Sequence, residues 1–246
     1  MDSQVAVGLT TQETQSILAE SEVIGGQRIP WGSNNTFLVH LDAGEGRHVR
    51  AVYKPGAGEQ PLHDFPWQTL YKREYAAYLL AEALGWPRIP MTVIRDGPAG
   101  VGSMQLYVEC DPNVTYFDLV SDRLDILAAF ATFDILTNNA DRKAGHCLLD
   151  GGNTIWSIDH GLTFHADFKV RTVMLEFWGQ PIPEVHLEDI KGVRDQLATN
   201  GELTANLREL LTDIEFDALR QRVDEVLATP VIPQLNPGHN VPWPLV

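Results

Sequence analysis

The amino-acid sequence predicts an α+β protein with two lobes, a β-rich lobe over residues 1–109 and a mainly helical lobe over residues 110–246. Two observations support this fold class. Alternating apolar and polar residues, which are typical of half-buried strands, dominate the first half of the chain. Helical periodicity dominates the second half and surrounds one strand–turn–strand pattern at 146–159.

The first lobe is expected to begin with a helix at 11–20, because a Thr-x-x-Glu start precedes a short apolar stripe. A long amphipathic helix is predicted at 67–84, after the loop at 55–66. Four segments have the period-two pattern of strands, namely 21–29, 35–42, 47–54 and 102–110.

The second lobe is expected to contain a helix at about 121–137 and an acidic helical stretch at about 184–228. Between them, HCLLD and NTIWSID form two strands joined by a Gly-Gly turn. The proline-rich tail at 231–246 is predicted to pack in extended form or to remain mobile.

Composition excludes several classes of protein. The chain has 246 residues, 44% of them hydrophobic, and a net charge of -15, which argues against broad contact with nucleic acid or an anionic membrane. No apolar run of about 18 residues and no signal-peptide pattern occurs. Cys110 and Cys147 are too few for a disulfide framework or a zinc site. We therefore expect a cytoplasmic protein without stable membrane association.

One carboxylate interrupts the apolar stripe of the predicted 67–84 helix. Glu74 lies on the same helix face as Leu70 and Ala77, so it needs a cation on a neighbouring element. Lys54, on the strand that precedes the helix, shares a strand face with Val52 and is the candidate. The alternative is that Lys54 is a solvated strand end and Glu74 tips outward.

Residues 138–148, NNADRKAGHCL, crowd polar side chains into a loop before the hairpin. A solvated turn is one interpretation, and a catalytic loop is the other. Phosphoryl transfer from ATP needs a lysine on the phosphates, a carboxylate that orients it, a second carboxylate as proton acceptor, and metal ligands. Lys54, Glu74, Asp141 and Asp159 fit these four roles. Asp141 and Asp159 are 18 residues apart, and one hairpin fills the interval, which brings both acids to one edge of a cleft.

The segments DILTNNADRKAGHCLL and IWSIDHGLTF resemble the catalytic segment of the phosphatidylinositol 3/4-kinase superfamily, especially type II phosphatidylinositol 4-kinases. Over about residues 20–180, the chain is similar to small bacterial phosphatidylinositol 3/4-kinase-like proteins. The resemblance implies a two-lobed protein-kinase-like fold with ATP and a divalent metal, Mg or Mn, in the interlobe cleft. It also implies that Val108 lies in the hinge that meets adenine and that Leu148 forms the floor under the base.

Two positions depart from that family pattern. His146 stands where the family has Asn as the second metal ligand, and imidazole suits Mn better than Mg. His146 is therefore either a metal ligand beside Asp159 or only the cap of the following strand. The phosphate loop lacks the usual glycine pattern, and only a short turn with Ser33 and Asn34 stands in its place.

Two basic residues next to Asp141 are also candidates. Lys143 is placed to neutralise charge on the transferred phosphoryl group. Arg142 either takes part in the site or holds the loop through an internal ion pair.

The favoured function is an ATP-dependent phosphotransferase, or kinase, acting on a hydroxyl of an unidentified protein or small-molecule substrate. Lys169 and Arg171 are the only basic residues in the segment after Asp159, and several acids lie nearby, so a phosphatidylinositol kinase is a minority hypothesis. Two further hypotheses are a nucleotide-binding pseudokinase with a regulatory role and an AMP transferase.

Overall fold

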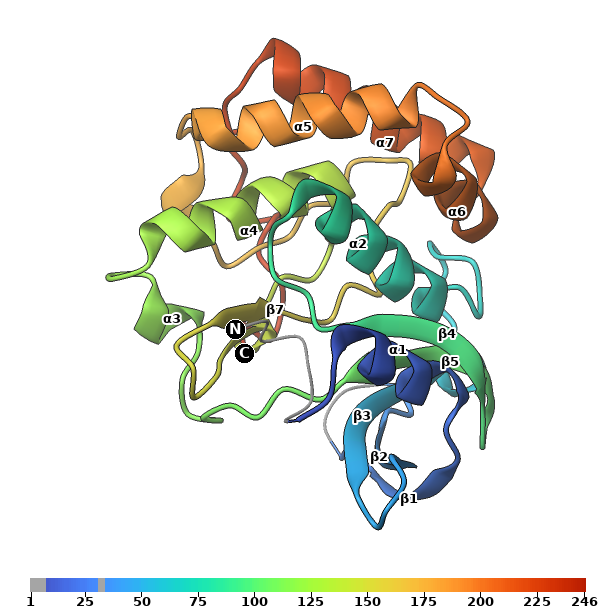
Figure 1. Ribbon diagram of the computed structural model, residues 1–246. Coiled ribbons are helices and arrows are strands. Elements are labelled where there is room, and N and C mark those ends of the chain that lie inside the picture. The colour runs from blue at the N-terminus through green and yellow to red at the C-terminus, as the bar shows by residue number, and fades with distance from the viewer. Residues whose placement is uncertain (1–7, 31–33) are drawn as a thin grey trace.

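The computed structural model describes residues 8–30 and 34–246, and they form the two-lobed α+β fold expected from the sequence (Figure 1). The first lobe is built on an antiparallel five-stranded sheet with the order β1-β2-β3-β5-β4. Its strands are β1 (Val23–Arg28), β2 (Phe37–Asp42), β3 (His48–Pro55), β4 (Thr92–Gly97) and β5 (Gly100–Leu106). Two helices accompany the sheet, α1 (Thr11–Glu20) and α2 (Leu70–Leu84).

The second lobe is mainly helical. Its helices are α3 (Tyr116–Leu119), α4 (Leu124–Thr137), α5 (Glu184–Leu197), α6 (Glu202–Leu210) and α7 (Asp213–Ala228). A two-stranded hairpin of β6 (Cys147–Leu149) and β7 (Ile155–Ser157) follows a 3-10 turn, η2 (Ala144–His146). Two other 3-10 turns are η1 (Gly56–Gly58) and η3 (Leu175–Phe177).

Strand β3 separates the core of the first lobe from the cleft. Val49, Ala51 and Tyr53 are buried, and they point into the sheet core. Val52 and Lys54 alternate with them and line the cavity between the lobes. The period of the strand therefore places the Lys54 side chain in the cleft.

Helix α2 lies between the sheet and the helical lobe (Figure 1). Its buried residues Ala76, Ala77 and Leu80 join the hydrophobic core of the second lobe, which includes Phe133 of α4. The helix ends at Gly85, whose φ of 79° is in the left-handed region that favours glycine. Because α2 packs on both lobes, the position of its Glu74 depends on both.

Several predicted boundaries were wrong. Helix α2 begins at Leu70 rather than 67, and α4 begins at Leu124 rather than 121. The strand predicted at 102–110 runs from Gly100 to Leu106, and it ends there because its partner β4 begins at Thr92, opposite Gln105. The helical stretch predicted at about 184–228 is confirmed and consists of the three helices α5, α6 and α7. The helix at 11–20 is confirmed, and the boundary between residues 109 and 110 stays a prediction.

Strand β4 and helix α3 were missed. Thr92 and Val93 are consecutive and both buried, so β4 lacks the alternation that marks a half-buried strand. Helix α3 has four residues, too few for a helical period to be visible.

The tail packs against the second lobe, in extended form near Ile232, and a turn at 236–240 interrupts this extended path. Ile232 exchanges backbone hydrogen bonds with Gly179 and Gln180, at 2.8 and 2.9 Å. The amide of Ala144 donates to the Leu245 carbonyl at 2.8 Å, so the tail reaches the loop that precedes β6.

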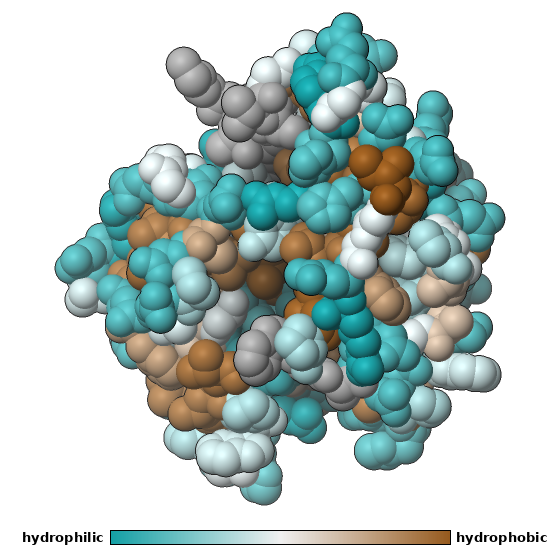
Figure 2. Space-filling model, turned by 90° about the horizontal axis from the view of Figure 1, so that it is seen from below, coloured by the Kyte–Doolittle hydropathy of each residue, from teal (hydrophilic) through white to brown (hydrophobic). Residues whose placement is uncertain are grey.

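The surface is predominantly hydrophilic on the face shown in Figure 2, where hydrophobic residues form small separate groups. Within residues 8–30 and 34–246, none of the helices combines the length and apolar character needed to cross a bilayer.

Candidate active site

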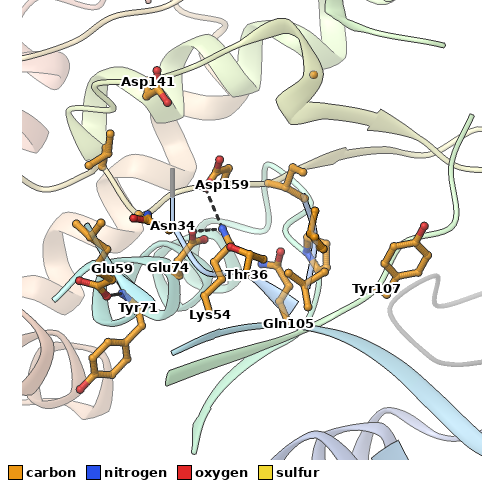
Figure 3. A pocket seen from close by; sticks show the side chains of 18 of the residues that line it. Asn34, Thr36, Lys54, Glu59, Tyr71, Glu74, Gln105, Tyr107, Asp141 and Asp159 are labelled. Atoms are coloured by element: carbon orange, nitrogen blue, oxygen red, sulfur yellow. Dashed lines mark hydrogen bonds and ion pairs between the residues drawn. The ribbon is translucent and has the colours of Figure 1, made fainter. Parts of the chain in front are cut away.

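A cavity of about 540 Å³ lies between the two lobes. Five of the residues predicted to bind nucleotide line it, and so do three of the residues predicted near the transferred phosphate (Figure 3). They are Asn34, Lys54, Glu74, Val108 and Leu148, and Asp141, Lys143 and Asp159. Ser33 lies outside the described residues.

Lys54 is held by two carboxylates in this cavity, as the dashed lines in Figure 3 show. Its Nζ forms an ion pair with Glu74 and lies 2.9 Å from Oδ1 of Asp159. Glu74 is only 3% exposed and also accepts the backbone N–H of His160 at 3.0 Å. Burial by itself would lower the pKa of Lys54, but the Asp159 and Glu74 carboxylates hold it well above its ordinary value. The lysine is therefore a fixed cation.

Asp159 follows β7 in a strained backbone conformation. Its φ is 62°, in the left-handed region that non-glycine residues rarely adopt. Lys54 holds the pKa of Asp159 well below its ordinary range, so the carboxylate is ionised. The second oxygen, Oδ2, lies 3.2 Å from Nε2 of His146.

His146 is buried at the start of the hairpin. Burial lowers its pKa to about 4, so the imidazole is neutral at physiological pH. Its Nδ1 accepts the Lys143 amide at 3.4 Å, a capping contact at the start of η2, so the proton of the neutral ring lies on Nε2 and faces Oδ2 of Asp159. Among the residues that the structure describes, no group of three or more His, Cys, Asp or Glu side chains surrounds one point. Asp159 lines the cavity, whereas His146 is not among its described lining residues, so their pairing as ligands of Mg or Mn stays a prediction.

Arg142 forms the internal ion pair that was one of its two interpretations from sequence. The side chain is fully buried, and its Nε and Nη2 donate to the two carboxylate oxygens of Asp134, at 2.9 and 2.8 Å. Its Nη1 lies 3.3 Å from the carbonyls of His146 and Ile158. Arg142 thus connects α4, the loop and the strand before Asp159, which explains part of the polar crowding at 138–148.

Asn138 and Asn139 also hold the loop. Asn138 ends α4 with a φ of 54° and donates to the carbonyls of His165 and Asp167, at 2.8 and 2.6 Å. The side-chain oxygen of Asn139 accepts the backbone N–H of Asp141 at 3.0 Å. These contacts fix the backbone on which Asp141 is carried.

Asp141 lies on the helical side of the cavity, across from Lys54 (Figure 3). Its Oδ2 is 3.2 Å from Nζ of Lys143. Burial raises the pKa of Asp141 to about 6, although the charge of Lys143 opposes the shift. A carboxylate with this pKa is a stronger proton acceptor than an ordinary aspartate at neutral pH.

The described part of the turn that was predicted to bind phosphate is joined to the β3–α2 connection. Oδ1 of Asn34 accepts the backbone N–H of Gln60 at 2.8 Å, and the Asn35 amide donates to the Gly58 carbonyl at the same distance. Asn34 therefore lines the cavity while its side-chain oxygen is hydrogen-bonded to Gln60.

Glu59 is a site residue that the sequence did not predict. It lines the cavity, is 8% exposed, and its Oε1 accepts the Tyr71 amide at 2.9 Å. Thr69, the residue before α2, makes no side-chain capping bond, so Glu59 supplies the acceptor at the helix N-terminus. No sequence pattern gives this contact, because Glu59 stands well outside the range of a local capping motif.

The apolar part of the cavity is suited to a planar base. Val52, Leu106, Val108 and Leu148 line it from the sheet, the connection between the lobes, and the hairpin. Lys54, Asp141 and Asp159 occupy the polar part. One cavity thus offers an apolar region and a charged region, the division that a nucleotide requires.

Several solved structures that resemble this chain are kinases. The Golgi casein kinase with Mn/ADP bound has a TM-score of 0.57 at 15% identity, over 88% of this chain and 74% of that chain. The Helicobacter pylori proinflammatory kinase CtkA has a TM-score of 0.53 at 12% identity, over 87% and 94% of the two chains. Hydra Fam20 with sugar gives 0.53 at 14% identity, over 87% and 86%. At these identities the likeness confirms the kinase-like fold.

The sequence comparison identifies one relative and no family model. None of the family models searched matches the chain. Protein Rv2133c of Mycobacterium tuberculosis is 36% identical over an alignment 277 positions long, which covers 98% of each chain. The resemblance to type II phosphatidylinositol 4-kinases stays a prediction. The chain belongs to the same family as Protein Rv2133c, and this family therefore includes a member with a kinase-like fold.

Proposed function

We propose that this protein is an ATP-dependent phosphotransferase that transfers the γ-phosphate to a hydroxyl group. The observation that carries the proposal is the arrangement in one cavity of a doubly paired Lys54, an ionised Asp159 and a half-buried Asp141. The kinase fold of the neighbouring structures supports it, and so does the Mn/ADP bound to the Golgi casein kinase.

Each residue has a distinct role in this proposal. The base lies against Val108 and Leu148, and Lys54 contacts the phosphates because Glu74 prevents it from turning away. Asp159 and His146 hold a divalent cation, Mg or Mn, which when bound neutralises charge on the phosphate oxygens.

Asp141 accepts the proton of the acceptor hydroxyl. As that proton leaves, the hydroxyl oxygen forms a bond to the γ-phosphorus, and the bond from this phosphorus to the bridging oxygen of ADP breaks. Nζ of Lys143 lies 3.2 Å from Oδ2 of Asp141 in the structure. From there it can contact the negatively charged phosphoryl group during its transfer.

ATP labelled at one phosphate position at a time tests this function. Purified protein is incubated with Mg or Mn and with ATP labelled in either the γ or the α position, with and without candidate hydroxyl acceptors. We expect transfer or slow release of the γ-label only, and its loss in Asp141→Asn. Transfer of the α-label would instead indicate an AMP transferase.

A nucleotide-binding pseudokinase is the second candidate. It is favoured by His146, which stands at the metal position and already contacts Asp159 at 3.2 Å. If ATP raises the melting temperature but no label moves with either metal, the regulatory function replaces the catalytic one.

A further inference from the structure

The C-terminal tail is hydrogen-bonded through Asn240 to the segment that follows Asp159. Asn240 is the residue of the tail that contacts this segment on both sides of Arg171. Its carbonyl accepts the Thr172 amide at 2.9 Å, and its Nδ2 donates to the Val170 carbonyl at 2.7 Å. Asn240 therefore fixes the backbone before and after Arg171.

Asn240 is itself fixed within the tail. Its Oδ1 accepts the Asn236 amide at 3.1 Å, and its own amide donates to the Asn236 carbonyl at 2.8 Å. The side-chain amide thus uses its oxygen inside the tail and its nitrogen on the neighbouring segment. Only a side chain with both a donor and an acceptor at its end makes this pair of contacts.

The opposite edge of the same segment is bonded to the loop that carries Asp141. The Arg171 amide donates to the Asn139 carbonyl at 3.0 Å, and the Arg142 amide donates to the Arg171 carbonyl at 2.9 Å. These two bonds flank Asp141 in the chain, one at Asn139 and the other at Arg142. A shift of the segment at Arg171 would therefore move the backbone on both sides of the proposed proton acceptor.

A further contact joins the tail directly to the loop. Leu245 accepts the Ala144 amide at 2.8 Å, beside Gly145, which lines the cavity. The tail therefore touches the loop at Ala144 and, through residues 170–172, on either side of Asp141.

We propose that Asn240 is a positioning residue, which holds residues 170–172 against the catalytic loop and thereby sets the place of Asp141 in the cavity. The inference rests on the proposed phosphotransfer, because it assigns Asp141 a position that matters for reaction. It gives the proline-rich tail a role in the site, although the tail contributes no lining residue to the cavity within the described part of the chain.

The test compares Asn240→Asp and Asn240→Ala with a control in the same tail, Asn236→Ala. The aspartate keeps the size and the acceptor of Asn240 but has no N–H for the Val170 carbonyl. The side-chain oxygen of Asn236 accepts the Gly238 amide at 2.9 Å, whereas its two contacts with Asn240 come from its backbone. Asn236→Ala therefore removes a side-chain contact within the tail and keeps the backbone groups that hold Asn240.

Two properties are measured for each variant. The first is kcat and KM for ATP, with an acceptor that the wild-type protein phosphorylates or, without one, from slow ATP hydrolysis. The second is the hydrogen-exchange rate of the Arg142 and Ala144 amides. We expect Asn240→Asp to lower kcat on the order of 10- to 100-fold with KM for ATP little changed, because a small misplacement of a reacting group has that effect. Exchange at Arg142 should become faster in both Asn240 variants and stay unchanged in Asn236→Ala.

The inference is overturned if Asn240→Asp matches the control in both kcat and exchange, or if kcat falls only together with ATP binding. A wild-type protein without phosphotransfer contradicts the proposed function, whereas the exchange measurement still decides whether Asn240 holds the loop. If Asn240→Asp does not fold, Asn240→Ala gives the same two readouts.

Discussion

Replacing Lys54 with methionine tests the central ion pair of the site. The substitution keeps an unbranched chain of similar length but removes the cation that Glu74 and Asp159 share. Glu74 is 3% exposed and would remain in the interior with a single neutral donor, the His160 amide. Two carboxylates would then face each other without the cation between them.

The magnitude follows from the burial of the two acids. Breaking a buried pair by removing one partner costs about 3 to 5 kcal/mol. Only the Glu74 contact counts in full, because the Asp159 side chain is 48% exposed and water screens its charge. Since Lys54 is itself 23% exposed, we expect the lower end, about 3 kcal/mol. For a chain of this size that corresponds to a fall in Tm of roughly 6 to 12 °C.

The assay is thermal unfolding of Lys54→Met, Glu74→Gln and the double variant, each with and without ATP and metal. The double variant should recover part of the loss, because the neutral amide no longer needs the cation, and contacting residues couple by about 0.5 to 3 kcal/mol. ATP should raise the Tm of the wild type and have little effect on Lys54→Met. The reasoning is refuted if the double variant loses the sum of the two single losses, or if Lys54→Met unfolds within about 2 °C of the wild type.

Three other predictions concern the loop and the sheet. The deprotonated form of Asp141 is the proton acceptor and its pKa is about 6, so kcat/KM should rise as the pH increases through about 6 and then level off; a flat profile from pH 5 to 8 would contradict this role. His146→Asn replaces an imidazole with an amide oxygen, so the ratio of the Mn rate to the Mg rate should fall, and an unchanged ratio would remove His146 from the metal site. In Gly102→Ala the added Cβ would collide with the Lys54 carbonyl, so Tm should drop; Gly151→Ala, with open space around it, is the control and should change Tm little, and equal Tm values for the two variants would contradict this.

The parts of the site that follow from local periodicity were predictable from the sequence. Strand alternation placed Lys54 on the face opposite Tyr53, and the helical repeat placed Glu74 on the buried stripe of α2. The structure brings these two residues into contact. The helix at 11–20 was also predictable, because the Thr10–Glu13 capping box is a local signal.

The contacts that hold the site from outside were not predictable in this way. Glu59 caps α2 from the preceding loop, and Asn240 binds a segment about 70 residues earlier in the chain. Such contacts depend on the path of irregular backbone, for which neither residue spacing nor composition gives a period. Strand β4 was missed for a related reason, since Thr92 and Val93 are both buried and show no alternation.

Arg142 shows how a sequence can leave two interpretations open. The Asp-Arg pair suggested either a reacting cation or a structural one, and only the position of Asp134, eight residues earlier on α4, decides between them. That pairing requires the turn at Asn138, where the chain reverses with a φ of 54°.

A crystal structure with a non-hydrolysable ATP analogue and Mn tests the central claim most directly. The account predicts the base between Val108 and Leu148 and the phosphates at Lys54. It also predicts the metal between Asp159 and His146, with the γ-phosphate facing Asp141. Nucleotide bound outside this cavity, or bound within it with the γ-phosphate out of reach of Asp141, would contradict the account.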